Sequence, residues 1–524
     1  GSALPLRIGA ARCRLRQRHG FGCHYSQRRL RRPYSKRSRQ APGLKLHLPF
    51  PQLNAATPYQ GTVHISLCEH GETVNNMRLT FKELKDQITK IVPKDVPYTV
   101  ELEAGNIAIV TPVPNKFGGG DGLIGKIAKR VKRKIVLRPD VSIMKSEEDA
   151  KKLIAEILPA EAEITNIYFD SCYRELIIQC QNPGEAVGRR GANLNALRDQ
   201  TGWLVKVERT SPLISKTVHD IRGYRQAHAV ERRKLLKDFG LNIHRPQRPG
   251  STWARVTALG SYREVGRACH FVTTNESRVM IDVGVNIASD TDPMPYFTAP
   301  EALPLEKLDA VVLTHAHLDH AGMLPVLFKY GYRGPVYCTP PTRDLMLLLQ
   351  TDYLKVGGSE GKRAPYDMED IRTCMKHVVD VDWNETTDIT PDIKLTFSNA
   401  GHILGSSAVH LQIGDGKHNI VFSGDQKYEK SWLFDAANTR FPRVETLVIE
   451  STYGASGDYQ PSRQEANQEL HDIISRTIAR GGKVICPVFA VGRSQEVMIA
   501  IDELFRSGQV KPVPVWLDGM IQEA

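Results

Sequence analysis

The chain has 524 residues, of which 41% are hydrophobic, and a formal net charge of +12. This length exceeds what a single hydrophobic core supports and predicts three or four domains. No run approaches the ~18 apolar residues of a membrane span, and no signal-peptide core is visible, so the sequence argues against a membrane protein. The nine scattered cysteines form no Cys-x-x-Cys pair, which argues against disulfides and thiolate zinc and favours the cytoplasm.

Residues 1–79 are predicted to form a basic, disordered tail. Residues 1–50 contain at least twelve Arg and Lys residues and no Asp or Glu, so nearly all of the excess positive charge lies there. By composition this tail could be an RNA-binding arm or an organellar transit peptide, and we favour a tail outside the folded domains. Because the rest of the chain is close to neutral, nucleic-acid binding has to be argued from local sites.

Residues 80–159 are predicted to form a first small domain. A helix is expected over 81–91, strands over 98–102 and 107–110, and a glycine-rich turn over 118–125. Gly122 and Gly125 have the spacing Gly-x-x-Gly, and the basic run that follows them would favour phosphate. A solvated amphipathic helix accounts for the same charges almost as well.

Residues 160–212 contain a stronger signal of the same kind. Gly188-Arg189-Arg190-Gly191 lies between two short helical patterns, and strands are expected over 164–169, 175–179 and 203–207. Glycines let a nucleic-acid backbone approach closely, and arginines hold its phosphates. This order resembles a KH domain, and residues 80–159 are then an earlier copy. The alternative is an ordinary tight turn. Residues 213–250 predict a helical linker.

A dense group of metal-ligand side chains follows an apolar strand pattern at 308–313. The sequence Thr314-His315-Ala316-His317-Leu318-Asp319-His320 places three imidazoles and a carboxylate within six positions. Imidazole nitrogen and carboxylate oxygen suit Zn²⁺ without any thiolate. The alternative is a solvated loop of clustered histidines that scavenges metal.

Further candidate ligands occur at the ends of other apolar, strand-like segments. Asp282 ends one at 279–282, His402 ends another at 397–402, and Asp425 ends a third at 419–425. Each residue alone is a weak signal, because an Asp or His after a strand is more often a turn or loop residue. Together with the histidine block they supply enough ligands for two metal ions.

Asp282, the block at 315–320, His402 and Asp425 resemble, in that order, the first four motifs of the metallo-β-lactamase fold. The resemblance extends along the chain at three further segments, which are Gly260–Arg267, Glu450–Gly454 and Phe489–Glu496. The first is similar to the segment that opens such enzymes, and the other two are similar to motifs of the β-CASP subgroup of nucleases.

With KH-like domains in front, residues 80–524 most resemble the archaeal nucleases related to the cleavage and polyadenylation specificity factor, a transcription termination factor family. This resemblance implies an α/β and α+β multidomain protein with two KH-like domains, a metallo-β-lactamase αββα sandwich over 251–451 and the start of a β-CASP α/β domain over 452–524. It implies a zinc-dependent ribonuclease, acting as an endonuclease and a 5′-3′ exonuclease in RNA 3′-end formation. It also implies single-stranded RNA, RNA polymerase and elongation factors as partners, and a homodimer.

The resemblance also implies roles for individual residues. Two Zn²⁺ ions would share Asp425, with His315, His317 and His402 completing the first site and Asp319 and His320 contributing to the second. Asp319 and Glu450 are then catalytic, and Glu450 is the acidic partner of a histidine that protonates the leaving oxygen. Asp282 is expected in the second coordination shell, where a carboxylate orients a ligand imidazole.

The family's last two histidines have no counterpart in this sequence. The only histidine after Asp425 is His471, which lies in a helical pattern and is expected to be an ordinary helix residue. We therefore expect a C-terminally truncated chain that keeps the first zinc site, holds the second weakly and has little activity.

Arg493 follows an expected strand at 484–488 and begins a helix, where it could bind RNA phosphate or pair with Glu496. Both interpretations stay open. Another strand is expected over 512–517.

Three other functions are weighed against the ribonuclease. A DNA-processing β-CASP hydrolase is disfavoured by the KH-like domain. A noncatalytic RNA-binding scaffold is disfavoured by the six intact ligand positions. A small-molecule hydrolase would leave both β-CASP-like segments unexplained.

Overall fold

The computed structural model describes residues 62–66, 79–118, 122–213, 215–248, 253–289, 291–359, 361 and 364–523. It is a mixed α/β, multidomain structure, as the sequence predicted, with separate sheets in its KH-like and metallo-β-lactamase-like parts. None of the helices within these residues is long and apolar enough to cross a membrane.

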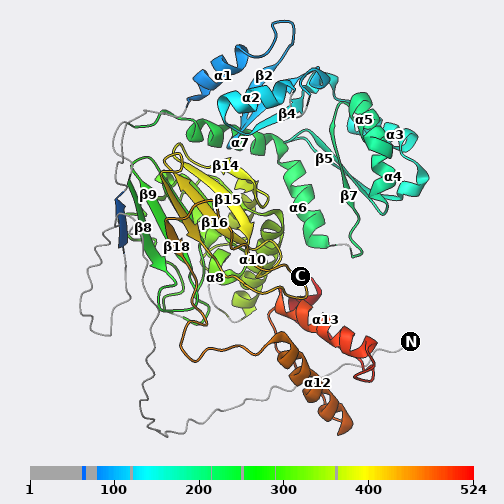
Figure 1. Ribbon diagram of the computed structural model, residues 1–524, viewed down its shortest axis with the longest axis vertical. Helices are drawn as coiled ribbons and strands as arrows, with labels where there is room; N and C mark the ends of the chain where they lie inside the picture. The colour runs from blue at the N-terminus through cyan, green and yellow to red at the C-terminus, as the bar shows by residue number, and fades with distance from the viewer. Residues whose placement is uncertain are drawn as a thin grey trace, which may run out of the picture. The chain divides into compact units, whose positions relative to one another are not determined.

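The larger part of the structure is built on two sheets (Figure 1). The seven-stranded sheet contains, in spatial order, β1 (Thr62–Ser66), β8 (Trp253–Gly260), β9 (Cys269–Thr274), β10 (Arg278–Ile281), β11 (Ala310–Val312), β12 (Val336–Cys338) and β13 (Val378–Asp380). The five-stranded sheet contains β14 (Thr386–Asp388), β15 (Ile393–Asn399), β16 (Ser407–Ile413), β17 (His418–Phe422) and β18 (Thr446–Val448).

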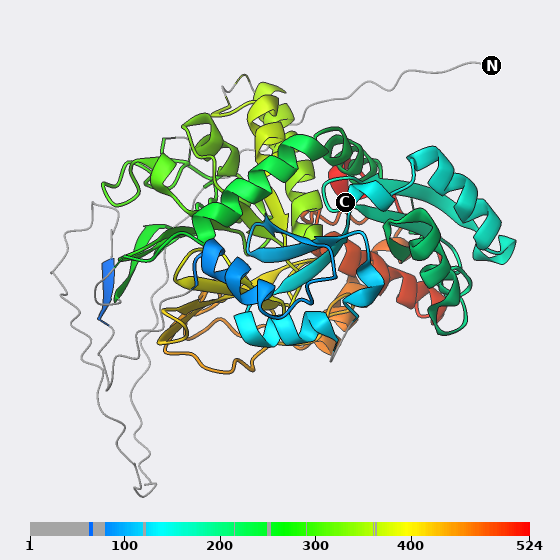
Figure 2. The same cartoon turned by 90° about the horizontal axis from the view of Figure 1, so that it is seen from above.

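Strand β1 corrects part of the prediction for residues 1–79. Thr62–Ser66 pairs antiparallel with β8 at the edge of the larger sheet (Figure 2), although the whole range was predicted to be a disordered tail. A short Thr-Val-His-Ile-Ser stretch suits an edge strand, but the arginine-rich composition averaged over the tail concealed it. The remainder of that predicted tail, through residue 78, lies outside the described residues.

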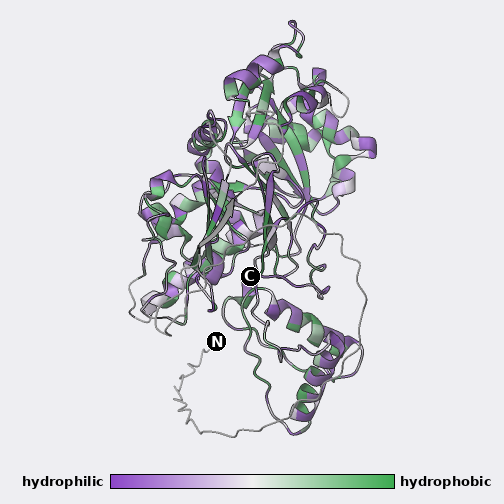
Figure 3. Cartoon of the chain, turned by 60° about the vertical axis from the view of Figure 1, so that its left-hand side comes forward, coloured by the Kyte–Doolittle hydropathy of each residue, from purple (hydrophilic) through white to green (hydrophobic). Residues whose placement is uncertain are grey.

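The two sheets pack against each other through a continuous apolar core. Val272, Val279 and Ile281 of one sheet and Phe397 and Leu411 of the other are all fully buried in one cluster. The helices alternate between polar and apolar residues along their length (Figure 3). This alternation is typical of helices that cover a sheet with one face only.

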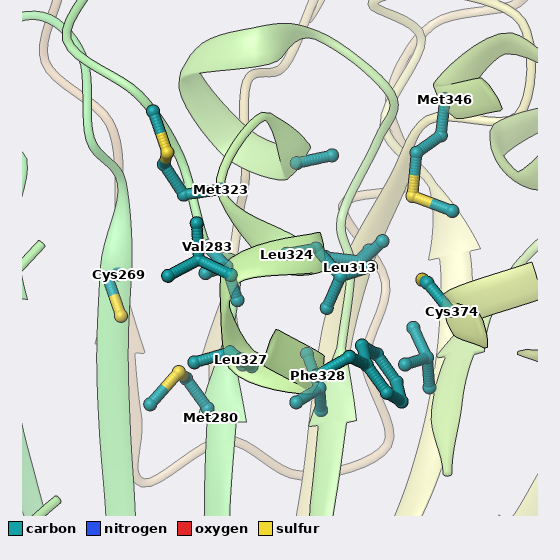
Figure 4. Packing of buried hydrophobic residues seen from close by; sticks show 14 of the residues in the cluster. Cys269, Met280, Val283, Leu313, Met323, Leu324, Leu327, Phe328, Met346 and Cys374 are labelled. Atoms are coloured by element: carbon teal, nitrogen blue, oxygen red, sulfur yellow. The ribbon is translucent and has the colours of Figure 1, made fainter. Parts of the chain in front are cut away.

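Four helices follow strands of the larger sheet and cover its other face. They are α8 (Leu318–Ala321), α9 (Leu324–Lys329), α10 (Pro340–Ser359) and α11 (Met368–His377). Their apolar residues, including Leu324, Phe328 and Cys374, join Met280 and Val283 in a second cluster (Figure 4). Because both faces of β10 and β11 are buried, the loops at their ends are firmly supported.

The KH-like region contains two modules with one topology. The first consists of α1 (Phe81–Thr89), β2 (Thr99–Glu103), β3 (Asn106–Thr111), α2 (Leu123–Val131) and β4 (Ile135–Pro139). The second consists of α3 (Glu147–Ile157), β5 (Ile164–Asp170), β6 (Glu175–Cys180), α4 (Pro183–Val187), α5 (Ala192–Thr201) and β7 (Leu204–Arg209). In each module the first two strands are antiparallel and the last strand is parallel to the second. The repeated order supports the interpretation of residues 80–159 as an earlier copy.

Two details of this region differ from the sequence prediction. The sequence predicted a boundary between the two modules at 159/160, which would place α3 in the first module. Ala150 and Ile154 of α3 are instead buried in the core of the second module. The amphipathic pattern of α3 could not show which core it joins. In the first module, Gly122 caps α2 and Gly125 lies within it, so this Gly-x-x-Gly opens a helix.

The predicted linker over 213–250 forms two helices, α6 (Lys216–Ala227) and α7 (Ala229–Ile243). Helix α7 is more than a connector, because Leu236, Phe239 and Ile243 are buried in the core between the sheets. Burial of such side chains contributes about 1.5–3 kcal/mol each.

The C-terminal region contains α12 (Arg463–Ala479) and α13 (Arg493–Arg506), which pack around Ile474 and Leu504. The strands expected over 484–488 and 512–517 were wrong, since neither segment pairs with a strand among the described residues. A strand requires a hydrogen-bonding neighbour, and an apolar run of the right length does not reveal whether one is present.

Replacing Phe397 with Ala should lower the free energy of unfolding by about 3–5 kcal/mol, because a fully buried ring between the sheets would leave a cavity. Urea unfolding followed by circular dichroism measures the change. Tyr459→Ala is the control, since that side chain is 89% exposed and its loss should change stability by less than about 0.5 kcal/mol. Equal effects of both substitutions would contradict the assignment of this core.

Candidate metal centre

The candidate metal ligands lie on loops that leave strands of both sheets. Strands β10 and β11 are parallel neighbours, so Asp282 and the block after Val312 emerge at the same edge. His402 follows β15 and Asp425 follows β17 in the other sheet. Six side chains that are up to 110 positions apart in sequence thereby converge on one place.

Four donor atoms form the first group. His317 Nδ1 lies 3.2 Å from both His315 Nε2 and His402 Nε2, and Asp425 Oδ2 lies 3.9 Å and 3.6 Å from those same two nitrogens. A tetrahedral zinc ion with bonds of about 2.0 Å has ligand atoms about 3.3 Å apart. The group therefore has the donor types and spacing that a tetrahedral metal ion requires.

The second group shares Asp425 with the first. Asp425 Oδ1 lies 3.1 Å from His320 Nε2, which is 3.8 Å from Asp319 Oδ2. One oxygen of Asp425 thus faces each group, which is how a carboxylate bridges two metal ions. All donor atoms within each group lie within 4.8 Å of one another.

Asp282 forms hydrogen bonds with the segment 314–320 that carries the histidine block. Its carboxylate accepts hydrogen bonds from the Thr314 amide at 2.7 Å, the Thr314 hydroxyl at 2.8 Å and His320 Nδ1 at 2.8 Å. A carboxylate only accepts, so His320 carries its proton on Nδ1 and directs Nε2 at Asp425. These bonds also hold Asp282 at a φ of +60°, a conformation that costs a non-glycine residue about 1–2 kcal/mol.

Thr314 sets the tautomer of a second imidazole, that of His315, through a hydrogen bond. Its hydroxyl proton is donated to Asp282, so the oxygen can only accept from His315 Nδ1, 3.0 Å away. The lone pair of His315 therefore lies on Nε2 and faces the first group of donors. Thr314 had no role in the sequence prediction, and its place directly before the histidine block is the signal that would have suggested one.

Burial keeps three of the imidazoles neutral. It lowers the pKa of His315 well below its usual value, lowers that of His317, and lowers the pKa of His402 to about 4. Burial acts in the same direction on His320, but Asp425 and Asp282 raise its pKa well above the usual range. Burial would raise the pKa of Asp425, yet His320 and the other rings hold it far below its usual value. Neutral imidazoles and an ionised carboxylate are the forms that bind metal.

Comparison with known proteins agrees with this architecture. The family model described as the metallo-beta-lactamase superfamily matches residues 262–470, and the model described as the KH domain of transcription termination factor FttA matches residues 78–144. Transcription termination factor FttA of Methanosarcina mazei is 49% identical over 443 residues, which are 84% of this chain and 70% of the relative. The chain belongs to the FttA family.

Other FttA proteins give a consistent result. The protein of Thermococcus kodakarensis is 46% identical over 451 residues, 84% of this chain and 69% of its own length. That of Lokiarchaeum sp. is 41% identical over 451 residues, 86% of this chain and 71% of its own length. The resemblance inferred from the motifs is therefore confirmed at the level of the family.

The predicted β-CASP segment at 489–496 lies against the metal centre. The Phe489 ring is 6.4 Å from the His317 ring, and a Cβ on Gly492 would come within 2.8 Å of the Ile403 side chain. Gly492 has a φ of +94°, so this close approach and conformation both require glycine. The segment thus supports the loop that carries His402.

Arg493 pairs with Glu496 at 3.0 Å, which was one of the two roles considered for it from the sequence. Its side chain remains 52% exposed. Lys427 lies 3.8 Å from the same carboxylate, and its pKa is lowered by burial and by Arg493. Sequence reasoning missed Lys427, which lies two positions after Asp425. The two cations give this side of the centre a positive field that suits an anionic substrate.

Glu450 is not placed next to any histidine among the described residues. Its backbone amide donates to Ser423 Oγ at 3.0 Å and its carboxylate accepts from the Thr452 amide at 3.0 Å. His471 lies on α12, where it contacts Asp472 at 2.8 Å, so the expectation of an ordinary helix residue agrees with the structure. The proposed acid–histidine pair therefore has only its acidic member here.

The loop of the second KH-like module presents two arginines to solvent. Arg189 and Arg190 are exposed between α4 and α5, and within the described part of the chain they have no ion pair. Gly188 and Gly191 have φ values of +74° and +77°, and Arg190 also has a positive φ of 54°. This left-handed backbone turns the loop outward and makes both guanidinium groups available to phosphate.

Replacing His402 with Ala should lower the ratio of bound zinc to chain at limiting free zinc, because the first group would lose one of its four donors. Equilibrium dialysis at fixed free zinc, followed by elemental analysis, measures the ratio. His418→Ala is a matched control, since His418 is buried in the same sheet but its Nε2 contacts Thr446 Oγ1 instead. An unchanged ratio in the His402 variant would exclude this ligand set.

Proposed function

We propose that the protein is a zinc-dependent ribonuclease that hydrolyses RNA phosphodiesters in RNA 3′-end formation and transcription termination in the cytoplasm. The observation that carries this proposal is the pair of donor groups that share Asp425. The family membership supports it, since the relatives are named transcription termination factors. We further propose endonuclease activity together with 5′-3′ exonuclease activity.

His315, His317, His402 and Asp425 would hold the first ion, and Asp319, His320 and Asp425 the second. When bound, two zinc ions supply hydroxide at neutral pH and neutralise charge on the scissile phosphate. The protein's own contribution is to fix the ligands in advance. Asp282 and Thr314 hold the Nδ1 protons of His320 and His315, so the Nε2 atom of each ring is the one directed at its donor group.

Substrate recognition would combine the metal centre with the KH-like loop. Arg189 and Arg190 are free to contact the phosphates of single-stranded RNA, and Gly188 and Gly191 allow the backbone to come close. Near the metal centre, Arg493 and Lys427 would attract the phosphate next to the cleaved bond. Asp319 and Glu450 remain the proposed catalytic carboxylates.

In the full-length protein, His317→Ala should abolish cleavage of labelled single-stranded RNA while RNA affinity stays unchanged. His317 Nδ1 contributes to the first donor group, whereas the KH-like loop is on a separate module. Gel-based cleavage and filter binding measure the two effects, with His418→Ala as control. Cleavage retained by the His317 variant would overturn the proposed function, and the same assay with labelled DNA tests the DNA-processing alternative.

Changing Arg189 and Arg190 together to Asp should weaken RNA binding and reduce its salt dependence. Loss of two phosphate contacts lowers the slope of log affinity against log salt by about 1.4 for single strands. The matched control replaces two exposed arginines at the C-terminal end of α12, Arg476 in its last turn and Arg480 directly after it, with Asp, which changes the net charge equally. Equal loss of affinity in both double variants would show a nonspecific charge effect and contradict a phosphate-binding loop.

A further inference from the structure

We propose that Arg267 is the positioning residue for Asp319, and that its side-chain contacts are required for the second metal ion but not for the first. This inference rests on the proposed two-metal function and assigns a task to the segment Gly260–Arg267, which has no role in the chemistry described above. The segment connects β8 to β9, and it contains no metal-ligand cluster among the described residues.

The backbone after Arg267 forms a strut between two loops of the metal centre. The Ala268 amide donates to the Asp319 carbonyl at 2.8 Å, and the Ala268 carbonyl accepts from the Gly284 amide at 2.9 Å. Ala268 therefore joins the loop that follows Asp282 to α8, the short helix that carries Asp319. No other loop of the centre receives a hydrogen bond from Ala268 in the described residues.

The backbone of Gly284 packs directly against the backbone of Asp319. A Cβ on Gly284 would lie 1.6 Å from the Asp319 carbonyl oxygen, so the two backbones are in direct contact. On either side, the Val283 amide donates to the His320 carbonyl at 2.7 Å and the Val285 amide to the Leu318 carbonyl at 2.9 Å. Val283 is itself buried in the apolar cluster shown in Figure 4. A shift of the strut would therefore displace Asp319.

Arg267 holds the strut in place through its side chain. Its Nε donates to Glu264 Oε1 at 2.6 Å, and its Nη1 donates to Asp292 Oδ2 at 2.5 Å. The guanidinium also lies over the Tyr296 ring, 5.4 Å from its centre. Only 6% of Arg267 is exposed, whereas the side chains of Glu264 and Asp292 are 26% and 50% exposed, so the contacts lie at the edge of the buried region. Such charge-assisted bonds are stronger than those between neutral groups.

The backbone of Arg267 requires this support. Its φ is +44°, in the left-handed region that disfavours residues with a side chain. Gly260 lies directly against it, since a Cβ there would come within 2.1 Å of the Arg267 carbonyl oxygen. Without the ion pairs, the segment would relax toward an ordinary conformation and withdraw Ala268 from Asp319.

The effect should be confined to the second metal site. Asp319 belongs only to the group that contains His320 and Asp425, whereas the first group takes its other ligands from His315, His317 and His402. Arg267 contacts none of these first-site residues in the described structure. A general loss of folding would weaken both sites, so the two explanations give different results.

The test measures zinc binding to the Arg267→Met chain by equilibrium dialysis over a range of free zinc. Met keeps much of the apolar stem and removes the charge and hydrogen bonds. We expect affinity for the second ion to fall about tenfold, while that for the first changes by less than about twofold. The visible absorption of bound Co²⁺ provides an independent signature, in which the first-site bands should remain.

Three further variants complete the design. Arg267→Lys should restore part of the second-site affinity, and Asp292→Asn should cause a smaller loss of the same kind. Arg245→Met is the matched control, because Arg245 also forms an ion pair, with Asp309 at 3.0 Å, but lies before β10 rather than at the metal loop. Its zinc binding should equal that of the wild type.

Equal weakening of both sites, unchanged binding of two ions, or an equal effect of Arg245→Met would overturn the role of Arg267. If Arg267→Met fails to fold, the Asp292→Asn result decides. A wild-type chain that binds only one ion would also overturn this inference while leaving the first site intact. A wild-type chain that binds no zinc would instead refute the proposed function itself.

Discussion

The parallel pairing of β10 with β11 is the interaction on which the metal centre depends. It brings the end of one strand beside the end of the next, so the Asp282 amide can donate to the Val312 carbonyl and its carboxylate can reach Thr314. Both strands are buried on two faces, which prevents the register from slipping by one residue and turning the ligands away. The position of every histidine in the block follows from this alignment.

The centre is organised in layers around that edge. Strand pairing places Asp282, Asp282 fixes Thr314 and His320, and Thr314 fixes the tautomer of His315. Burial then keeps His315 and His402 neutral, which is the form in which an imidazole binds metal. The fold therefore holds these side chains in an arrangement that favours the binding of a positive ion.

The clustering of the six candidate donor side chains could be predicted from sequence, because the segments that carry them follow buried strands, and parallel strands within each sheet end at the same edge. The same reasoning failed for residues 484–488, because pairing is a property of two segments and only one is visible in a local pattern. The sequence prediction also assigned α3 to the first module. Its apolar residues, Ala150 and Ile154, could pack against either core, and the local pattern does not show which. Arg267 escaped notice for a related reason, because its contacts with Asp292 and Tyr296 are between distant positions.

The two extended segments of the C-terminal region have a consequence for the behaviour of this chain in solution. Ile485 and Trp516 are both 89% exposed, and their segments form no ladder with a strand in the described residues. An exposed apolar segment without a paired strand is a place to which another chain can add a strand. At high concentration, self-association should thus begin at these segments, even though the metal centre and the packed sandwich remain fully folded.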